Sequence, residues 1–306
     1  MAGDGEMDDS TSPSKRHQVR EKARQLREKQ HKRELRNRVL LQGGIGVLII
    51  AVIVAVVMIV VSSIKPETAG PKNMASDGIV IGKDLVAQTT PALAAGASPV
   101  QASADPDVAH IRIYVDYLCP WCGDFEKTNI DQLEGWLNSG AAVLEIHPIA
   151  VLTSKSQGTE YSLRAANAAA CVADESPDSF FAFNKALFEK QPDEGTKGLT
   201  DDQLVTLASS AGASSIADCV DDMTYSSWVQ SATERAVSGP LPGTEVERVE
   251  ATPTVLVNGK QYTGSLTDEE EFHAFVVATN SETVATTTPS PSATPQDDEG
   301  DGSDEK

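Results

Sequence analysis

Aromatic residues, cysteines and basic residues are all scarce in this chain of 306 residues. Aromatic side chains make up 5% of it, and its four cysteines are too few for a domain held together mainly by disulfides. Only 25 Lys and Arg stand against 45 Asp and Glu, which gives a formal net charge of −20. This acidity excludes a general affinity for nucleic-acid phosphates, so we expect no nucleic acid among the partners.

The charges are distributed unevenly around one long apolar stretch. Residues 1–64 carry 11 Lys and Arg and 7 Asp and Glu, whereas residues 65–306 carry 14 and 38. Residues 43–64 contain no charge and, at ~1.5 Å per residue, would form a helix of about 33 Å, enough to cross a bilayer. A buried soluble helix would show a polar face, and a cleaved signal peptide would have a shorter apolar region nearer its start. We therefore predict a single uncleaved transmembrane helix.

The charges beside this helix predict its orientation. All 11 Lys and Arg of the first 64 residues lie within residues 15–38, and an excess of this kind marks the cytoplasmic side. We expect residues 1–42 to be a cytoplasmic basic segment and residues 65–306 to be extracytoplasmic, which places the protein in the cell membrane. The basic segment could instead bind RNA, but its place beside the apolar stretch favours contact with lipid headgroups.

Composition and periodicity divide the outer part into a linker, a folded domain and a tail. Residues 65–108 are rich in Ala, Ser, Pro and Thr, which indicates a flexible linker with one short strand at 78–82. Residues 281–306 are rich in Thr, Ser and Pro and then acidic, which predicts a disordered tail. The domain 109–280 is expected to contain a strand at 109–115, a helix at 120–137, a strand at 142–149, a helical block at 157–237, a hairpin at 254–262 and a final helix. A helix between two strands predicts parallel pairing, so the fold class is α/β.

The motif Cys119-Pro120-Trp121-Cys122 lies between a predicted strand and a predicted helix. A zinc site needs four ligands, and the sequence has no second cysteine or histidine pair to complete one. A c-type haem site needs His after the second cysteine, where Gly123 stands. A purely structural disulfide around two residues would gain little from closing so short a loop. We interpret the pair as a redox-active dithiol and expect neither a metal nor another cofactor.

The place of the two cysteines predicts different roles for them. Cys119 precedes the helix, where free N–H groups and the helix dipole stabilise a thiolate, so we expect it to be the exposed nucleophile. Cys122 lies one helical turn deeper and is the expected resolving thiol. The remaining cysteines, Cys171 and Cys219, both fall in the helical block and are predicted to form a structural disulfide. The alternative is two buried free cysteines that pack as small hydrophobic side chains.

Residues 115–123, the helical block and residues 251–255 together resemble an extracytoplasmic DsbA-like oxidoreductase. The likeness is to the membrane-anchored actinobacterial type and covers about residues 78–280. It implies a thioredoxin-like fold with an inserted helical block, here preceded by the transmembrane helix. It also implies that the Thr252-Pro253 bond is cis and faces the cysteine pair, where Thr252 and Pro253 would shape a substrate groove together with Pro120 and Trp121. The alternative is an ordinary trans-proline that opens an edge strand.

Two positions depart from the pattern of the resembled family. The dipeptide between the cysteines is Pro-Trp, whereas the best-known strong oxidases have Pro-His, and Trp121 cannot supply a titratable donor. Ile113 stands where thioredoxin-like proteins often have a buried acid. Asp116 and Glu126 are the nearest carboxylates and could relay protons, although we expect both to be solvated surface charges.

The favoured function is that of a thiol-disulfide oxidoreductase that introduces disulfides into secreted proteins. The resemblance implies two kinds of partner: reduced secreted or cell-envelope proteins, and a quinone-linked membrane oxidase that regenerates the disulfide. The alternatives are a disulfide isomerase or reductase of the same fold, or a peptide-binding chaperone module that uses the groove without turnover.

Overall fold

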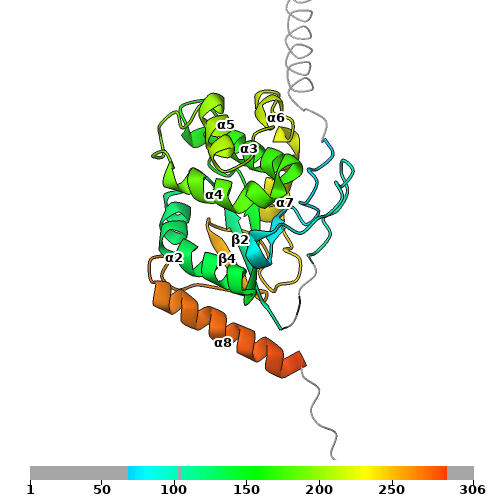
Figure 1. The fold of residues 1–306 in the computed structure, drawn as a ribbon, viewed down its shortest axis with the longest axis vertical. Helices are drawn as coiled ribbons and strands as arrows, with labels where there is room; N and C mark the ends of the chain where they lie inside the picture. Colours follow the sequence, from blue (N-terminus) through cyan, green and yellow to red (C-terminus); the bar gives the residue numbers. More distant parts are fainter. Residues whose placement is uncertain (1–67, 103–104, 106, 288–306) are drawn as a thin grey trace, which may run out of the picture. The chain divides into compact units, whose positions relative to one another are not determined.

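The computed structural model describes residues 68–102, 105 and 107–287 (Figure 1). The predicted cytoplasmic segment, the apolar stretch at 43–64 and the end of the chain beyond residue 287 lie outside the described residues. Within the described part, none of the helices combines the length and apolar character needed to span a bilayer.

The strands of the described chain form one mixed sheet in the order β1-β3-β2-β4-β5. Their bounds are β1 Ile79–Ile81, β2 Ala109–Val115, β3 Ala142–Pro148, β4 Thr254–Val257 and β5 Lys260–Gln261. β2 and β3 are parallel, while β1, β4 and β5 pair antiparallel with their neighbours. Helix α2, Pro120–Ser139, connects the parallel pair, because parallel strands need a crossover of this length. The prediction of an α/β fold with this crossover is confirmed.

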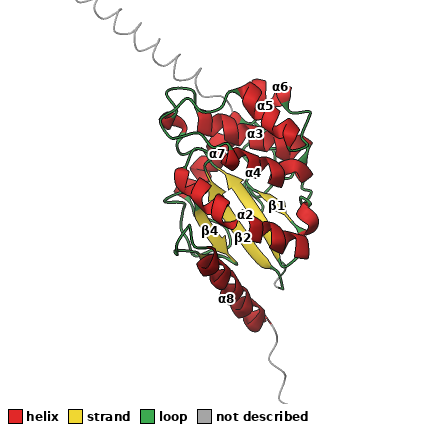
Figure 2. Ribbon diagram, turned by 60° about the vertical axis from the view of Figure 1, so that its left-hand side comes forward, coloured by secondary structure: helices red, strands yellow, loops and turns green. Residues whose placement is uncertain are grey.

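The sheet separates two apolar clusters because alternate side chains of a strand point to opposite faces. Ile111 and Ile113 of β2 belong to the main core, whereas Tyr114 belongs to a smaller cluster. Helices α2 and α8, Glu269–Thr287, pack on the main-core face (Figure 2). Their contact includes Phe125 and Phe272, whose rings meet edge to face with centroids 5.1 Å apart.

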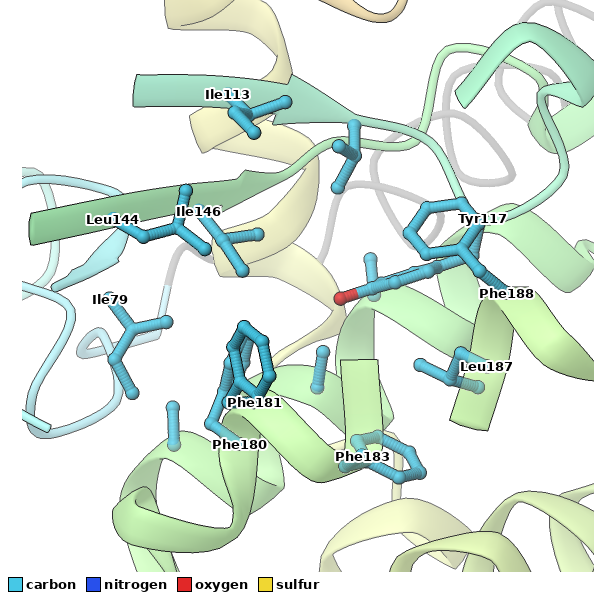
Figure 3. Packing of buried hydrophobic residues seen from close by; sticks show 14 of the residues in the cluster. Ile79, Ile113, Tyr117, Leu144, Ile146, Phe180, Phe181, Phe183, Leu187 and Phe188 are labelled. Atoms are coloured by element: carbon cyan, nitrogen blue, oxygen red, sulfur yellow. The ribbon is translucent and has the colours of Figure 1, made fainter. Parts of the chain in front are cut away.

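The helical block gathers at one end of the strands in both ribbon views (Figures 1 and 2). It consists of α3 Tyr161–Glu175, α4 Phe180–Glu189, α5 Asp201–Ser210, α6 Ala217–Asp221 and α7 Ser226–Ser238. Short 3-10 helices lie at Lys83–Leu85, Thr153–Lys155 and Pro177–Ser179. In Figure 3, the rings of Phe180 and Phe181 lie between α4 and the sheet side chains Leu144 and Ile146, which continues the core from the sheet into the block.

The structure differs from the predicted domain boundaries at both ends. The segment expected to be a linker supplies strand β1, and its side chains Met74, Ile79 and Ile81 are fully buried in the main core. The side-chain amide of Asn73 also donates to the carbonyl of Ala173 at 2.8 Å. At the other end, α8 continues past residue 280 to Thr287. Few apolar residues among many small ones conceal an edge strand, because composition does not show what those few residues contact.

Candidate active site

The cysteine pair lies where β2 passes into α2. Cys119 is the N-cap of α2, with φ −74° and ψ 116°, and Pro120 occupies the start of the helix, where its missing N–H costs nothing. The carbonyl of Cys119 accepts the backbone N–H of Cys122 at 3.1 Å and of Gly123 at 3.2 Å. This turn, residues 119–123, is called the redox turn below. It places the Cys119 sulfur at the helix terminus, as the sequence predicts.

Both active-site cysteines are reduced and buried in the structure. Cys122 is 1% exposed and Cys119 only 5% exposed, so the expectation of an openly exposed nucleophile is wrong in degree. Trp121 between them is 63% exposed and presents a large apolar surface beside the sulfur. Attack on Cys119 therefore has to come from a partner that fits closely around it.

The loop before β4 closes the site from the other side. The Thr252-Pro253 peptide bond is cis, and the Thr252 carbonyl oxygen lies 3.2 Å from the Cys119 sulfur. Both residues are partly exposed. The structure thus brings together the redox turn and the Thr-Pro segment, which are more than a hundred residues apart in the sequence.

The environment of Cys119 favours its thiolate. A hydrogen bond from the Cys122 thiol, followed by contacts from the Thr252 side chain and the N–H groups of Cys122 and Trp121, lowers the pKa of Cys119 to about 6 against the opposing effect of burial. A thiol can donate to the Thr252 carbonyl and a thiolate cannot, so that contact favours the protonated form. The donors prevail over the carbonyl and the burial together.

Cys122 shows the opposite behaviour. Burial, together with its hydrogen bond and proximity to the negative Cys119 sulfur, raises the pKa of Cys122 well above its ordinary value. The two thiols are therefore chemically distinct although only two residues separate them. At neutral pH the reduced pair holds one negative charge, on Cys119, and one proton, on Cys122.

Asp116, three residues before the nucleophile, is a buried bridge and not the expected surface charge. It is 0% exposed. Its carboxylate accepts the N–H of Leu118 at 2.9 Å, the N–H of Leu152 at 2.8 Å and the hydroxyl of Ser162. Burial raises the pKa of Asp116, while these donors oppose the rise. Asp116 thereby joins the segment before the redox turn to the loop after β3 and to the start of α3.

Glu126, one helical turn beyond Cys122, is also buried, at 5% exposure, contrary to expectation. Its carboxylate accepts the side-chain amide of Asn184 at 2.7 Å, and the Asn184 carbonyl accepts the Tyr117 hydroxyl at 3.1 Å. Burial raises the pKa of Glu126 to about 7, against the lowering effects of Asn184 and Lys185. A carboxyl group that titrates near neutral pH beneath the redox turn can take up or release a proton during turnover.

Three polar residues of the helical block reach the site, and the sequence gave no signal for them. Ser162 of α3 donates to Asp116, Asn184 of α4 donates to Glu126, and Gln191 after α4 donates to the Cys119 carbonyl. Each lies among residues typical of ordinary helices. Only the folded chain shows that they converge on the redox turn.

The other predicted cysteine pair lies within the block, away from the reacting sulfurs. Cys171 of α3 and Cys219 of α6 form a disulfide with their Cα atoms 6.0 Å apart. Among the described residues, no group of His, Cys, Asp and Glu side chains is arranged to hold a metal ion.

A second buried polar cluster lies on the sheet face opposite the main core. Glu145 of β3 accepts the Arg112 Nε at 2.8 Å, and the Nε2 atoms of His110 and His147 each lie 3.0 Å from its carboxylate. Although burial opposes ionisation, these neighbours hold the pKa of Glu145 well below its ordinary range. The cluster connects β2 to β3 and does not contact the cysteines, so we interpret it as structural.

Comparison with known proteins follows the same line. A family model described as thioredoxin matches residues 104–277, more than half of the chain. The chain belongs to the thioredoxin family. This thioredoxin-family chain is similar to the reduced form of a disulfide bond oxidoreductase (DsbG) from Mycobacterium tuberculosis, with 29% identity and a TM-score of 0.50, over 70% of this chain and 95% of that one.

Two further relatives show the same likeness in part. Reduced DsbA from M. tuberculosis has 30% identity and a TM-score of 0.49, over 69% of this chain and 100% of that one. The serine/threonine-protein kinase PknE of M. tuberculosis is 31% identical over 107 residues, which are 34% of this chain and 19% of the kinase. The chain thus spans about a fifth of the length of the curated relatives it matches. The fold and the reduced cysteine pair are those of a thiol-disulfide oxidoreductase of the DsbA type.

Proposed function

We propose that this protein is an extracytoplasmic thiol oxidase that introduces disulfides into reduced secreted or cell-envelope proteins, anchored to the membrane by residues 43–64. The observation that carries the proposal is the contrast between the two active-site thiols. The pKa of Cys119 is lowered to about 6, whereas that of Cys122 is raised well above its ordinary value. A stabilised Cys119 thiolate favours the reduced protein, and a dithiol that is stable when reduced is a strong oxidant as a disulfide.

The proposed reaction transfers two electrons from the client to the cysteine pair. A client thiolate attacks the Cys119 sulfur, the Cys119–Cys122 bond breaks, and Cys122 leaves and takes up a proton. A second client thiolate then attacks the client sulfur of the mixed disulfide, and Cys119 leaves as a thiolate. The client loses two electrons and its two thiol protons; one proton stays on Cys122 and the other is released. A thiolate with a pKa of about 6 is a good leaving group, which favours release of the oxidised client.

The cis-Pro segment and Trp121 supply the proposed client groove. The Thr252 carbonyl lies beside the Cys119 sulfur, so an extended peptide that pairs with the backbone there would bring its own cysteine to that sulfur. The exposed ring of Trp121 offers apolar surface on the other side of the sulfur. Because Cys119 is itself buried, a client that pairs poorly with this groove would react slowly.

After one turnover the pair is a dithiol and needs an electron acceptor. We propose a quinone-linked membrane oxidase in this role, since the other described cysteines, Cys171 and Cys219, are bonded to each other. In cells, removal of this partner would make the Cys119–Cys122 pair accumulate as dithiol. Protease added to protoplasts would degrade residues 65–306 and spare the N-terminal segment if the proposed topology is right.

The decisive experiment equilibrates the purified protein with glutathione and then supplies it with a reduced, unfolded client. We expect a reduction potential above the ~−270 mV of thioredoxin and below the ~−120 mV of the strongest oxidase, with one client disulfide formed per oxidised pair. The control is the double variant Cys119→Ser, Cys122→Ser, which should form no disulfides. A potential at or below that of thioredoxin would favour a reductase. Preferential repair of scrambled disulfides would favour an isomerase, and full activity of the control would favour a chaperone.

A further inference from the structure

Gln191 connects the helical block directly to the backbone of the redox turn. Its side-chain Nε2 donates to the carbonyl of Cys119 at 2.8 Å and to the carbonyl of Tyr117 at 3.2 Å. These two carbonyls flank the residue that leads into the nucleophile. A single amide group, carried by a residue 72 positions away, therefore holds the chain on both sides of Leu118.

The end of α4 fixes where this amide stands. The backbone N–H of Gln191 donates to the carbonyl of Phe188 at 3.3 Å, and Pro192 follows, which prevents the helix from continuing. The ring of Phe188 is buried against Tyr117, with their centroids 5.2 Å apart (Figure 3). Gln191 is thus delivered to the redox turn by a packed helix end and not by a free loop.

Gly123 provides the space that the Gln191 side chain occupies. A Cβ atom at position 123 would lie 2.1 Å from the Gln191 Oε1 atom, far inside any allowed contact. Gly123 lies inside α2 with ordinary helical geometry, so its backbone does not require glycine. Since glycine weakens a helix relative to alanine, its presence here has no local advantage. The close approach of Gln191 accounts for it.

We propose that Gln191 is a positioning residue of the redox site, which holds the redox turn in the geometry that stabilises the Cys119 thiolate. The Cys119 carbonyl receives three donors: the Gln191 amide and the N–H groups of Cys122 and Gly123. Fixing this carbonyl also fixes the peptide groups that follow it, whose N–H groups at Trp121 and Cys122 face the Cys119 sulfur. The donor end of the amide also adds positive charge density beside the turn. The proposal rests on the proposed function only in taking Cys119 as the reactive thiol.

The direct test removes the donor while keeping the bulk of the side chain. Gln191→Met retains the length of glutamine and loses the amide, and Gln191→Glu in its ionised form loses the donor and adds a negative charge. We expect the pKa of Cys119, followed by thiolate absorbance in the reduced protein, to rise in Gln191→Met and to rise further in Gln191→Glu. The equilibrium with glutathione should shift several-fold toward the protein disulfide in both variants.

The matched control is Gln157→Met. Gln157 is an exposed glutamine whose amide donates to the carbonyl of Gly195 at 2.7 Å, away from the cysteines. Its substitution should leave the Cys119 titration and the glutathione equilibrium unchanged. If Gln191→Met lowers the thermal stability but leaves both redox measurements equal to those of Gln157→Met, Gln191 is merely structural and the proposal is wrong.

A mutant cycle with Gly123 tests the contact itself. Gly123→Ala should displace the Gln191 amide and raise the pKa of Cys119, as Gln191→Ala does. In the Gln191→Ala background the added methyl group has room, so the second substitution should change the pKa little. Additive effects of the two substitutions would overturn the proposal. A wild-type Cys119 that titrates like a free cysteine would instead refute the proposed function, which keeps the two failures distinguishable.

Discussion

The low pKa of Cys119 depends chiefly on the Cys122 thiol, and this gives a quantitative prediction. A hydrogen bond to a charged acceptor contributes ~1.5–3 kcal/mol, and a pKa changes by one for each ~1.4 kcal/mol. The helix terminus contributes only ~0.3–1 kcal/mol at an accessible site. Cys122→Ala should therefore move the titration midpoint of Cys119 upward by about 1–2 pH units from about 6. Cys122→Ser keeps an O–H donor at the same position and should leave the midpoint much lower than Cys122→Ala does.

The assay has to follow a pH profile, because the alkylation rate at one neutral pH is nearly uninformative. At about pH 7 a thiol with a pKa of about 6 is roughly 90% ionised, and a free cysteine roughly 3%, a ~30-fold difference. The nucleophilicity of a thiolate falls with its pKa, which makes the Cys119 thiolate ~10–20-fold less reactive in itself. The two effects nearly cancel at neutral pH. The midpoint of the alkylation rate against pH has no such cancellation.

Iodoacetamide alkylation of Cys119, followed by mass mapping over a range of pH, measures this midpoint. In Cys122→Ala and Cys122→Ser, Cys119 is the remaining free thiol of the described chain, because Cys171 and Cys219 are bonded to each other. In the wild type, Cys122 does not compete, because its pKa is raised well above its ordinary value. An unchanged midpoint in Cys122→Ala would refute the reasoning, since the helix terminus and the Thr252 contacts would then be sufficient.

Two further predictions concern stability. The pKa of Glu126 is raised from 4.5 to about 7 in the folded protein, so the folded state binds a proton that the unfolded chain releases, and stability should fall as pH rises through that window. Glu126→Gln should remove this slope and add up to ~3 kcal/mol above about pH 7, in urea unfolding of the oxidised form, where the cysteines do not titrate; an equally steep slope in the variant would contradict the assignment. The Cys171–Cys219 disulfide spans 48 residues, so replacing both cysteines by alanine should cost ~4 kcal/mol in denaturant unfolding and leave the Cys119 titration unchanged. A loss below ~1 kcal/mol would mean that the unfolded chain is already compact there.

The sequence predicted those parts of the fold that local patterns determine. Strands β2 and β3 and the helix between them follow from apolar runs and from the Pro120 start of α2. The capping box at Thr200 is present, with Thr200 and Gln203 exchanging hydrogen bonds at 2.9 and 3.3 Å. A second expected box at Thr267 lies one residue later, because the Asp268 carboxylate accepts the N–H of Glu271 at 3.0 Å. Neighbouring residues with capping side chains make such boundaries ambiguous by one position.

The redox motif was predictable for the same reason, whereas its surroundings were not. Two cysteines at this spacing before a helix show their chemistry without knowledge of the fold. Asp116 and Glu126 illustrate the limit, because an acidic residue in a sequence is normally an exposed one. Their burial depends on donors that reach them from other elements, among them the backbone of Leu152 and the side chain of Asn184. No local pattern announces such a meeting.

The inserted helical block therefore does more than cover one end of the sheet. It supplies Ser162 to Asp116, Asn184 to Glu126 and Gln191 to the Cys119 carbonyl, so each polar group packed behind the redox turn has a partner from the block. Buried carboxyl groups without such donors would be costly and would lose their charge more readily. The minimal arrangement of sheet, α2 and α8 would place the same two cysteines at the same helix terminus. The charge and the proton affinities around them, however, are set by residues of the insertion, and it follows that changes in this block can retune the redox chemistry without altering the cysteine motif.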